Sequence, residues 1–93
     1  MSPKLVAETY ASVVSASELR EQRIAAGLTI RGLANAIGAH SHSALHRLEL
    51  PVERGGRTTL SAERAVKIIV ALGIPPHQVH HYFRFHGVEA GVA

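Results

Sequence analysis

The 93-residue chain contains no cysteine, no aspartate and no tryptophan. Without cysteine it has no disulfides, no thiolate nucleophile and no cysteine-ligated zinc site. The absence of disulfides also fits a reducing cytoplasm, where we expect the protein to act. Aromatic residues make up only 4% of the sequence, so leucine, isoleucine, valine and alanine must supply most of the core.

Long apolar runs are missing as well. The longest, over residues 68–74, is far shorter than the roughly 20 residues that span a bilayer. Residues 1–5 carry one lysine and no long apolar run follows them, so we expect no signal peptide. The length predicts a single domain with one small core, which leaves little room for a deep catalytic cleft. We therefore expect neither a membrane protein nor an enzyme.

Most of the basic residues in the sequence are arginines. The formal net charge is +3 with a pI near 10.0, and eight of the ten lysine and arginine residues are arginine. A guanidinium group suits bidentate contacts to phosphate and to guanine. This balance favours a nucleic-acid partner, although a basic domain without such a partner would have the same composition.

Helix signals fill the first half of the chain. Ser15 and Glu18 form a capping box, which predicts a helix over residues 16–26. Thr29 can cap a short second helix over residues 30–37, whose apolar positions fall on one face. Glycines follow both segments and provide their ends.

Further helices are predicted beyond this pair. A short one is expected over residues 42–50, where Pro51 stops it. Thr59 can cap a longer one over residues 60–72, and a last helix is expected over residues 76–85. Together the segments predict an all-α fold, a compact domain of five or six helices.

The two ends of the chain carry weaker patterns. Apolar residues between 5 and 14 fall near one helical face, which predicts a helical extension over residues 1–15. The β-branched residues Val13 and Val14 leave a strand as the alternative. Residues 87–93 show no periodicity, and we expect a mobile tail there.

The functional prediction rests on two short helices joined by a tight turn at Gly38. The second of them presents a polar outer face, and an α-helix with such a face fits the major groove of DNA. Arg47 can fork onto guanine, while His42 and His46 can donate to purine N7 or to phosphate. The predicted base contacts are His42, Ser43, His46 and Arg47.

This arrangement resembles a known family. Gly27-Leu28-Thr29, Leu33-Ala34 and Ile37-Gly38, with Glu49 closing the second short helix, are similar to the lambda-repressor/Cro-type helix-turn-helix family, also called the xenobiotic-response-element family. The resemblance covers residues 17–79. It implies a lambda-repressor-like DNA-binding domain, which we place at residues 16–86.

The resemblance also implies roles for individual residues. An ion pair between Arg23 and Glu49 would tie the second helix to the scaffold. In the family the loop after that helix usually meets the DNA backbone. The predicted backbone contacts are Thr29, Arg31, Ser41, Arg54 and Arg57.

Two positions depart from the family pattern. One extra residue near His40 leaves the register of the turn open by one. Ile30 stands where the family often has a polar residue that touches phosphate, and Arg31 beside it can take that role.

The seven histidines suggest a metal site as a competing interpretation. His42 and His46, like His77 and His81, have the spacing of a helical zinc pair. A complete site needs about four ligands, and no cysteine or aspartate completes either pair. We expect no metal and no cofactor. Neighbouring serines and histidines without a buried orienting carboxylate do not make a catalytic triad.

The sequence therefore predicts a sequence-specific double-stranded DNA-binding regulator, a repressor or Cro-like protein of a phage or mobile element. The partner would be an operator, and a homodimer through residues 76–85 is possible. The alternative is an antitoxin or protein-binding adaptor that engages a partner through residues 3–14 or 76–86.

Overall fold

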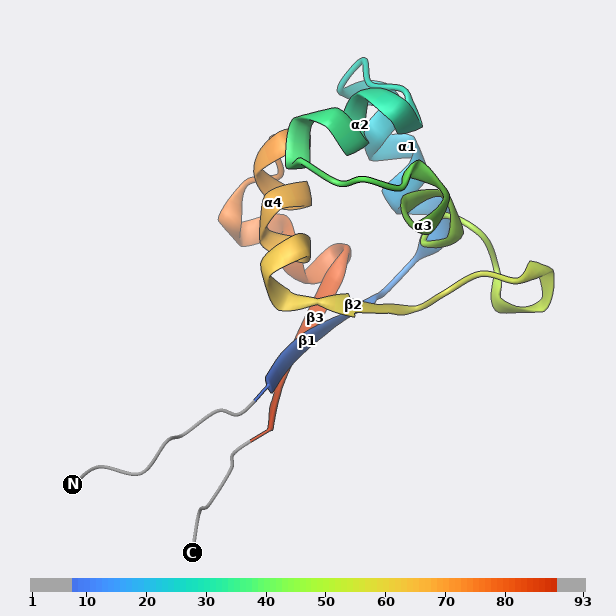
Figure 1. Cartoon of the computed structure of the whole chain (residues 1–93). Helices are drawn as coiled ribbons and strands as arrows, with labels where there is room; N and C mark the ends of the chain where they lie inside the picture. The colour runs from blue at the N-terminus through green and yellow to red at the C-terminus, as the bar shows by residue number, and fades with distance from the viewer. Residues whose placement is uncertain (1–7, 89–93) are drawn as a thin grey trace, which may run out of the picture.

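The computed structural model describes residues 8–88, which form helices packed beside a small sheet (Figure 1). In chain order the elements are β1 (Glu8–Val13), α1 (Ala16–Ala25), α2 (Ile30–Ile37), α3 (His42–Arg47), the 3₁₀ turn η1 (Val52–Arg54), β2 (Thr59–Ser61), α4 (Ala62–Leu72), the 3₁₀ segment η2 (Pro76–His81) and β3 (Phe83–Val88). The fold is therefore α+β, and the predicted all-α class is wrong.

The sheet is antiparallel, with the strand order β2-β1-β3. Its central strand β1 places Ala11 opposite Leu60 on one side and opposite Phe85 on the other. Only every second side chain of a strand faces the core. Accordingly Ala11 is fully buried, while Tyr10 on the opposite face is exposed.

Two predicted helices are replaced by this sheet. The chain over 8–13 is strand β1, which was the alternative that the β-branched residues left open. The predicted helix over 76–85 begins as the 3₁₀ segment η2 and then extends into β3. The reason is tertiary, because the backbone groups of each strand find partners in the other and Phe83 of the extended strand β3 is buried in the core.

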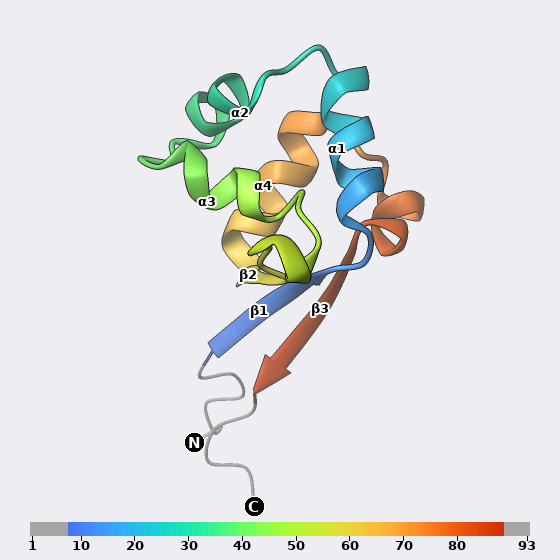
Figure 2. The ribbon, with the colours of Figure 1, turned by 90° about the vertical axis from the view of Figure 1, so that its right-hand side faces the viewer.

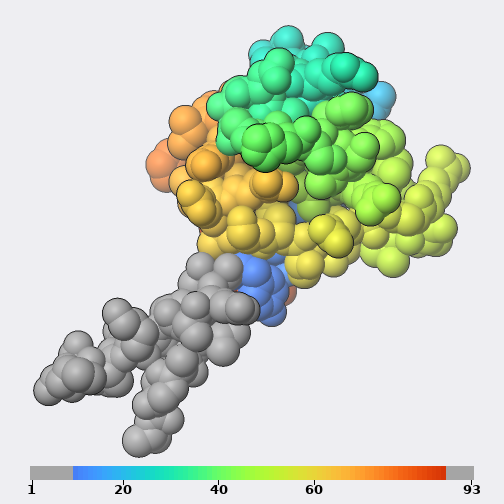
Figure 3. Space-filling view, in the orientation of Figure 1, coloured from blue at the N-terminus to red at the C-terminus, as the bar shows by residue number. Residues whose placement is uncertain are grey.

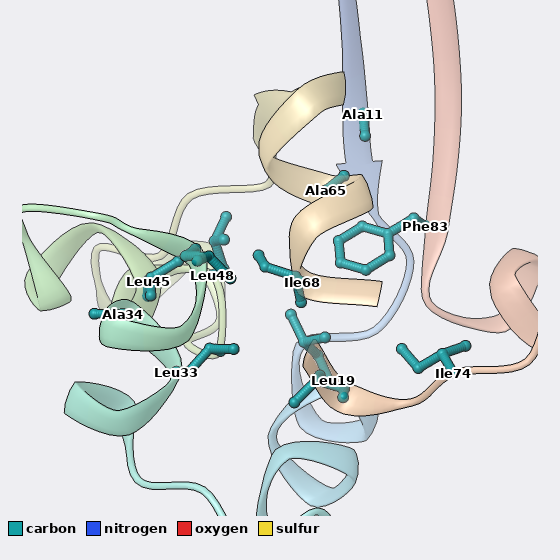
Figure 4. Close-up of a cluster of buried hydrophobic side chains, with 12 residues drawn as sticks. Ala11, Leu19, Leu33, Ala34, Leu45, Leu48, Ala65, Ile68, Ile74 and Phe83 are labelled. Carbon is teal, nitrogen blue, oxygen red and sulfur yellow. The ribbon is translucent and has the colours of Figure 1, made fainter. Parts of the chain in front are cut away.

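One core joins the sheet to the helices. Figure 4 shows Ile68 of α4 and Leu19 of α1 between two groups of buried side chains. Leu33 and Leu45 come to this core from α2 and α3, and Phe83 comes from β3. The sheet therefore shares the core that supports the two short helices.

The helix ends follow the capping signals closely. The Ser15 hydroxyl accepts a hydrogen bond from the Glu18 amide at 3.3 Å, and the Thr29 hydroxyl accepts one from the Gly32 amide at 2.9 Å. The boundaries predicted for α2 are confirmed. Helix α4 begins later than predicted and is capped by Ser61, since Thr59 pairs with Ser12 in the sheet.

The predicted segments at the two ends of the chain extend beyond the described residues. The parts of the predicted extension over residues 1–7 and of the predicted tail over residues 89–93 lie outside the described residues. Gly87 and Val88, also assigned to the tail, belong to β3. Within residues 8–88 no helix combines the length and apolar character needed to cross a bilayer.

Candidate nucleic-acid interface

The turn between α2 and α3 has a defined register. Gly38 ends α2 in the left-handed conformation at φ 71°, where glycine is favoured. The amide of Ala39 donates to the Ala34 carbonyl at 2.8 Å, and Ser41 is the N-cap residue of α3. Ala39 packs half-buried against the core, while His40 is exposed. The turn therefore spans residues 38–41.

Helix α3 is held by one face and is open on the other. Leu45 is only 2% exposed and points into the core (Figure 4), whereas His42, Ser43, His46 and Arg47 are all exposed. The helix is shorter than the predicted 42–50, because its last turn tightens into i to i+3 hydrogen bonds. In Figure 2, α2 and α3 lie together at the side of the molecule away from α1.

The exposed face of α3 lines a hollow of about 690 Å³. Its lining residues are Ile30, His42, Ser43, His46, Arg47, Leu50, Arg54 and Gly55. Figure 3 shows the α2–α3 surface in green, with the loop that carries η1 projecting beside it in yellow-green. The structure thus brings the four predicted base-contacting residues together with the predicted backbone contact Arg54.

A buried ion pair fixes the end of this helical unit. The Nε and Nη2 atoms of Arg23 donate to the two carboxylate oxygens of Glu49 at 2.7 and 3.0 Å. The remaining Nη1 donates to the Leu28 carbonyl at 2.7 Å. One guanidinium in α1 therefore holds both the residue just after α3 and the chain leading into α2, which limits their relative movement.

The loop after α3 is also fastened to it. The Arg57 amide donates to the Arg47 carbonyl at 2.9 Å, and the Gly56 amide donates to the Pro51 carbonyl at 3.0 Å. Gly56 packs so closely that a Cβ atom there would lie 1.9 Å from the Leu50 carbonyl oxygen. Backbone contacts thus set where the loop arginines stand relative to α3.

The remaining predicted backbone contacts surround this surface. Thr29 and Arg31 are exposed at the start of α2, and the Ser41 hydroxyl makes no capping bond to α3. Arg57 lines a second hollow of about 190 Å³ together with Arg64 of α4. Arg64, in the first turn of α4 after the basic loop, is not among the predicted contacts.

The charge of this region is strongly one-sided. Between residues 29 and 57 the chain has four arginines and two glutamates. One of these glutamates, Glu49, is neutralised by Arg23, so Glu53 is the only carboxylate of the segment without that partner. All four arginines are exposed. Such a surface attracts polyanions and is suited to contact phosphates on either side of a groove.

The histidines of α3 do not assemble a metal centre. His42 and His46 are exposed, and within residues 8–88 no group of three or more potential ligands stands close enough together to hold a metal ion.

The fold and this surface define a helix-turn-helix DNA-binding protein. Comparison with known families agrees, since residues 16–82 match the family described as Helix-turn-helix domain. The protein belongs to that family, and its resemblance to the lambda-repressor/Cro type is confirmed. The family consists of DNA-binding, non-enzymatic domains. Membership therefore indicates that the chain is a DNA-binding regulator. Searches of curated proteins and of solved structures gave no match.

Proposed function

We propose that the protein is a sequence-specific transcription repressor that reads double-stranded DNA by inserting α3 into the major groove. The observation that carries the proposal is the exposed row of His42, Ser43, His46 and Arg47 on a helix whose other face is buried. Side chains presented from a rigid element keep their spacing when they meet base edges, which sequence reading requires.

Each of these side chains supplies a different chemistry. Arg47 can donate two parallel hydrogen bonds to guanine O6 and N7, the commonest specific contact in the major groove. His42 and His46 can donate to purine N7, and the Ser43 hydroxyl can either donate or accept. With one guanidinium and three smaller polar groups, we expect one strongly specified guanine and weaker preferences beside it.

The surrounding residues would hold the helix in place on the duplex. Arg54 and Arg57 in the loop, and Arg31 at the start of α2, can pair with phosphates on the two flanking strands. Thr29 and Ser41 can donate hydroxyl hydrogen bonds to phosphate oxygens. Such contacts set position and make the affinity depend on salt through counterion release.

Repression follows from simple occupancy of an operator that overlaps the site of the polymerase. Activation would need a further surface that recruits the polymerase. The resemblance to the lambda-repressor/Cro type supports a Cro-like role in a phage or mobile element, with action in the cytoplasm of the bacterium or infected host.

The test combines selection with one substitution. Random duplexes are enriched on the purified protein, and the enriched site is measured again with Arg47→Ala. We expect the binding free energy to weaken by about 1–3 kcal/mol and the base preference at one base pair to be reduced. Arg57→Ala is the matched control, because loss of a phosphate contact should weaken all sequences about equally.

Two results would contradict the proposal. If Arg47→Ala weakens every duplex equally, α3 does not read bases through this arginine. If no duplex is enriched and the protein instead co-purifies with another protein, the adaptor or antitoxin alternative is favoured.

A further inference from the structure

The hollow along α3 is polar except at two points. Among the described residues that line it, only Ile30 and Leu50 carry aliphatic side chains, and both are half-buried. An aliphatic side chain forms no hydrogen bond and gains free energy by covering apolar surface. Whatever enters the hollow is therefore met by an apolar group at these two points and by polar groups elsewhere.

Ile30 is the more firmly held of the two. It is the first residue of α2, which begins where the Thr29 hydroxyl accepts a hydrogen bond from the Gly32 amide at 2.9 Å. Part of the Ile30 side chain packs against the core, and the remainder lines the hollow. Branching at Cβ also restricts its rotation about χ1 in a helix. Ile30 thus presents an apolar surface in a fixed position.

This surface shares the hollow with the predicted base contacts. His42, Ser43 and His46 of α3 line the same space as Ile30, so a base pair that enters it meets both kinds of side chain. In the major groove each base edge offers hydrogen-bond donors and acceptors, and thymine alone projects an apolar group, its C5-methyl. The apolar feature of DNA that Ile30 fits is therefore this methyl group.

The phosphate backbone is a poor partner for Ile30. A phosphate oxygen covered by an alkyl group loses its hydrogen bonds to water and gains none in return, which costs free energy. Arg31, the next residue of α2, is exposed and carries the cation that suits a phosphate. The two neighbours therefore suit different parts of the duplex, Arg31 the backbone and Ile30 the bases.

We propose that Ile30 is a specificity-determining residue that recognises the C5-methyl group of one thymine beside the bases contacted by α3. This inference rests on the proposed function, because the methyl group is within reach only when α3 lies in the major groove. The contact selects thymine over cytosine at one position without a hydrogen bond. Burial of one carbon group of this size corresponds to about a fourfold change in affinity.

The test removes the methyl group and the side chain separately. In the duplex enriched by selection, each thymine is replaced in turn by uracil, which lacks only the methyl group. Dissociation constants are measured at one salt concentration for the unaltered protein and for Ile30→Ala. We expect one position at which uracil weakens the unaltered protein about fourfold and leaves the affinity of Ile30→Ala unchanged.

The comparison of the two proteins isolates the contact. Uracil also changes the deformability of the duplex, but both proteins bind the same duplex, so this effect cancels. The matched control is Ile24→Ala, which removes the same atoms from a half-exposed isoleucine of α1 and should keep the fourfold loss. Circular dichroism checks folding. Should Ile30→Ala fail to fold, Ile30→Val is measured in its place and should show a smaller loss than the unaltered protein.

Two outcomes would overturn the inference. In the first, no replacement of thymine by uracil weakens the unaltered protein. In the second, the Ile30 variant loses as much affinity as the unaltered protein at every position, so that another group contacts the methyl. If Arg47→Ala still reduces the base preference at one position in either case, the proposed function stands and only the role of Ile30 is wrong. If no duplex is enriched, both fail together.

Discussion

The helix-turn-helix unit and the sheet differ in how far apart along the chain their determining residues lie. In α1 and α2 the signals are local, because the capping residues Ser15 and Thr29 lie next to the helices they begin. The sheet joins three segments from different parts of the chain, and Ala11 pairs with Phe85 from near the opposite end of the described residues. The proposed DNA-reading half is thus specified by short stretches of sequence, while its support depends on distant contacts.

The largest effect is expected where the two short helices are tied to α1. Glu49→Ala would leave the Arg23 guanidinium buried without its partner, since the side chains are only 11% and 3% exposed. We expect the free energy of unfolding to fall by about 3–5 kcal/mol. Urea denaturation followed by circular dichroism measures this loss.

An exposed ion pair of the same kind provides the control. Glu63 and Lys67 lie one turn apart on α4 at 3.6 Å and are largely solvated. Glu63→Ala should cost about 0.3–0.5 kcal/mol. Equal losses in the free energy of unfolding would mean that the Arg23–Glu49 pair is solvated and does not fix the helix-turn-helix unit.

A similar loss in the free energy of unfolding is expected from a core substitution in the sheet. Phe83 and Leu45 are each 2% exposed and enter the same core from β3 and α3. We expect Phe83→Ala to cost about 3–5 kcal/mol and Leu45→Ala about 2–5 kcal/mol, each in a single transition. Denaturation is followed both by the helical signal and by tyrosine fluorescence.

Comparing the helical signal with tyrosine fluorescence shows whether the sheet and the helices unfold as one unit or as two independent parts. If the sheet were an appendage, Phe83→Ala would shift the tyrosine transition and leave the helical transition in place. Coincident transitions in both variants would show that the sheet and the helices unfold together.

This difference also explains what could be read from the sequence. The boundaries of α2, the capping of α1 and the family resemblance all rest on residues a few positions apart. Strand β1 could be predicted only as the alternative to a helix, because Val13 and Val14 fit a helical face as well as a strand. The alternation of Phe83 and Phe85 is typical of a strand, but the same residues also fit the helix that is predicted to begin at Pro76.

The candidate site was predictable to a similar degree. The exposed positions on α3 follow from its period of 3.6 residues, once Leu45 is assigned to the core. The closeness of Arg54 to α3 was not predictable from spacing, because it depends on the hydrogen bonds of Arg57 and Gly56 to neighbouring turns. The exact place of the extra turn residue likewise needed the Ala39–Ala34 bond.

The smallest effect compares one arginine from each region. Arg54 lines the hollow at α3, whereas Arg84 is exposed on the face of the sheet that carries Tyr10. If Arg54 meets a phosphate, Arg54→Ala should make the slope of log K against log salt shallower by about 1, while Arg84→Ala should leave it unchanged. Both substitutions lower the net charge equally, so a difference between them reflects position. Equal changes would mean that the whole basic surface attracts DNA, and that the loop after α3 has no special part in binding.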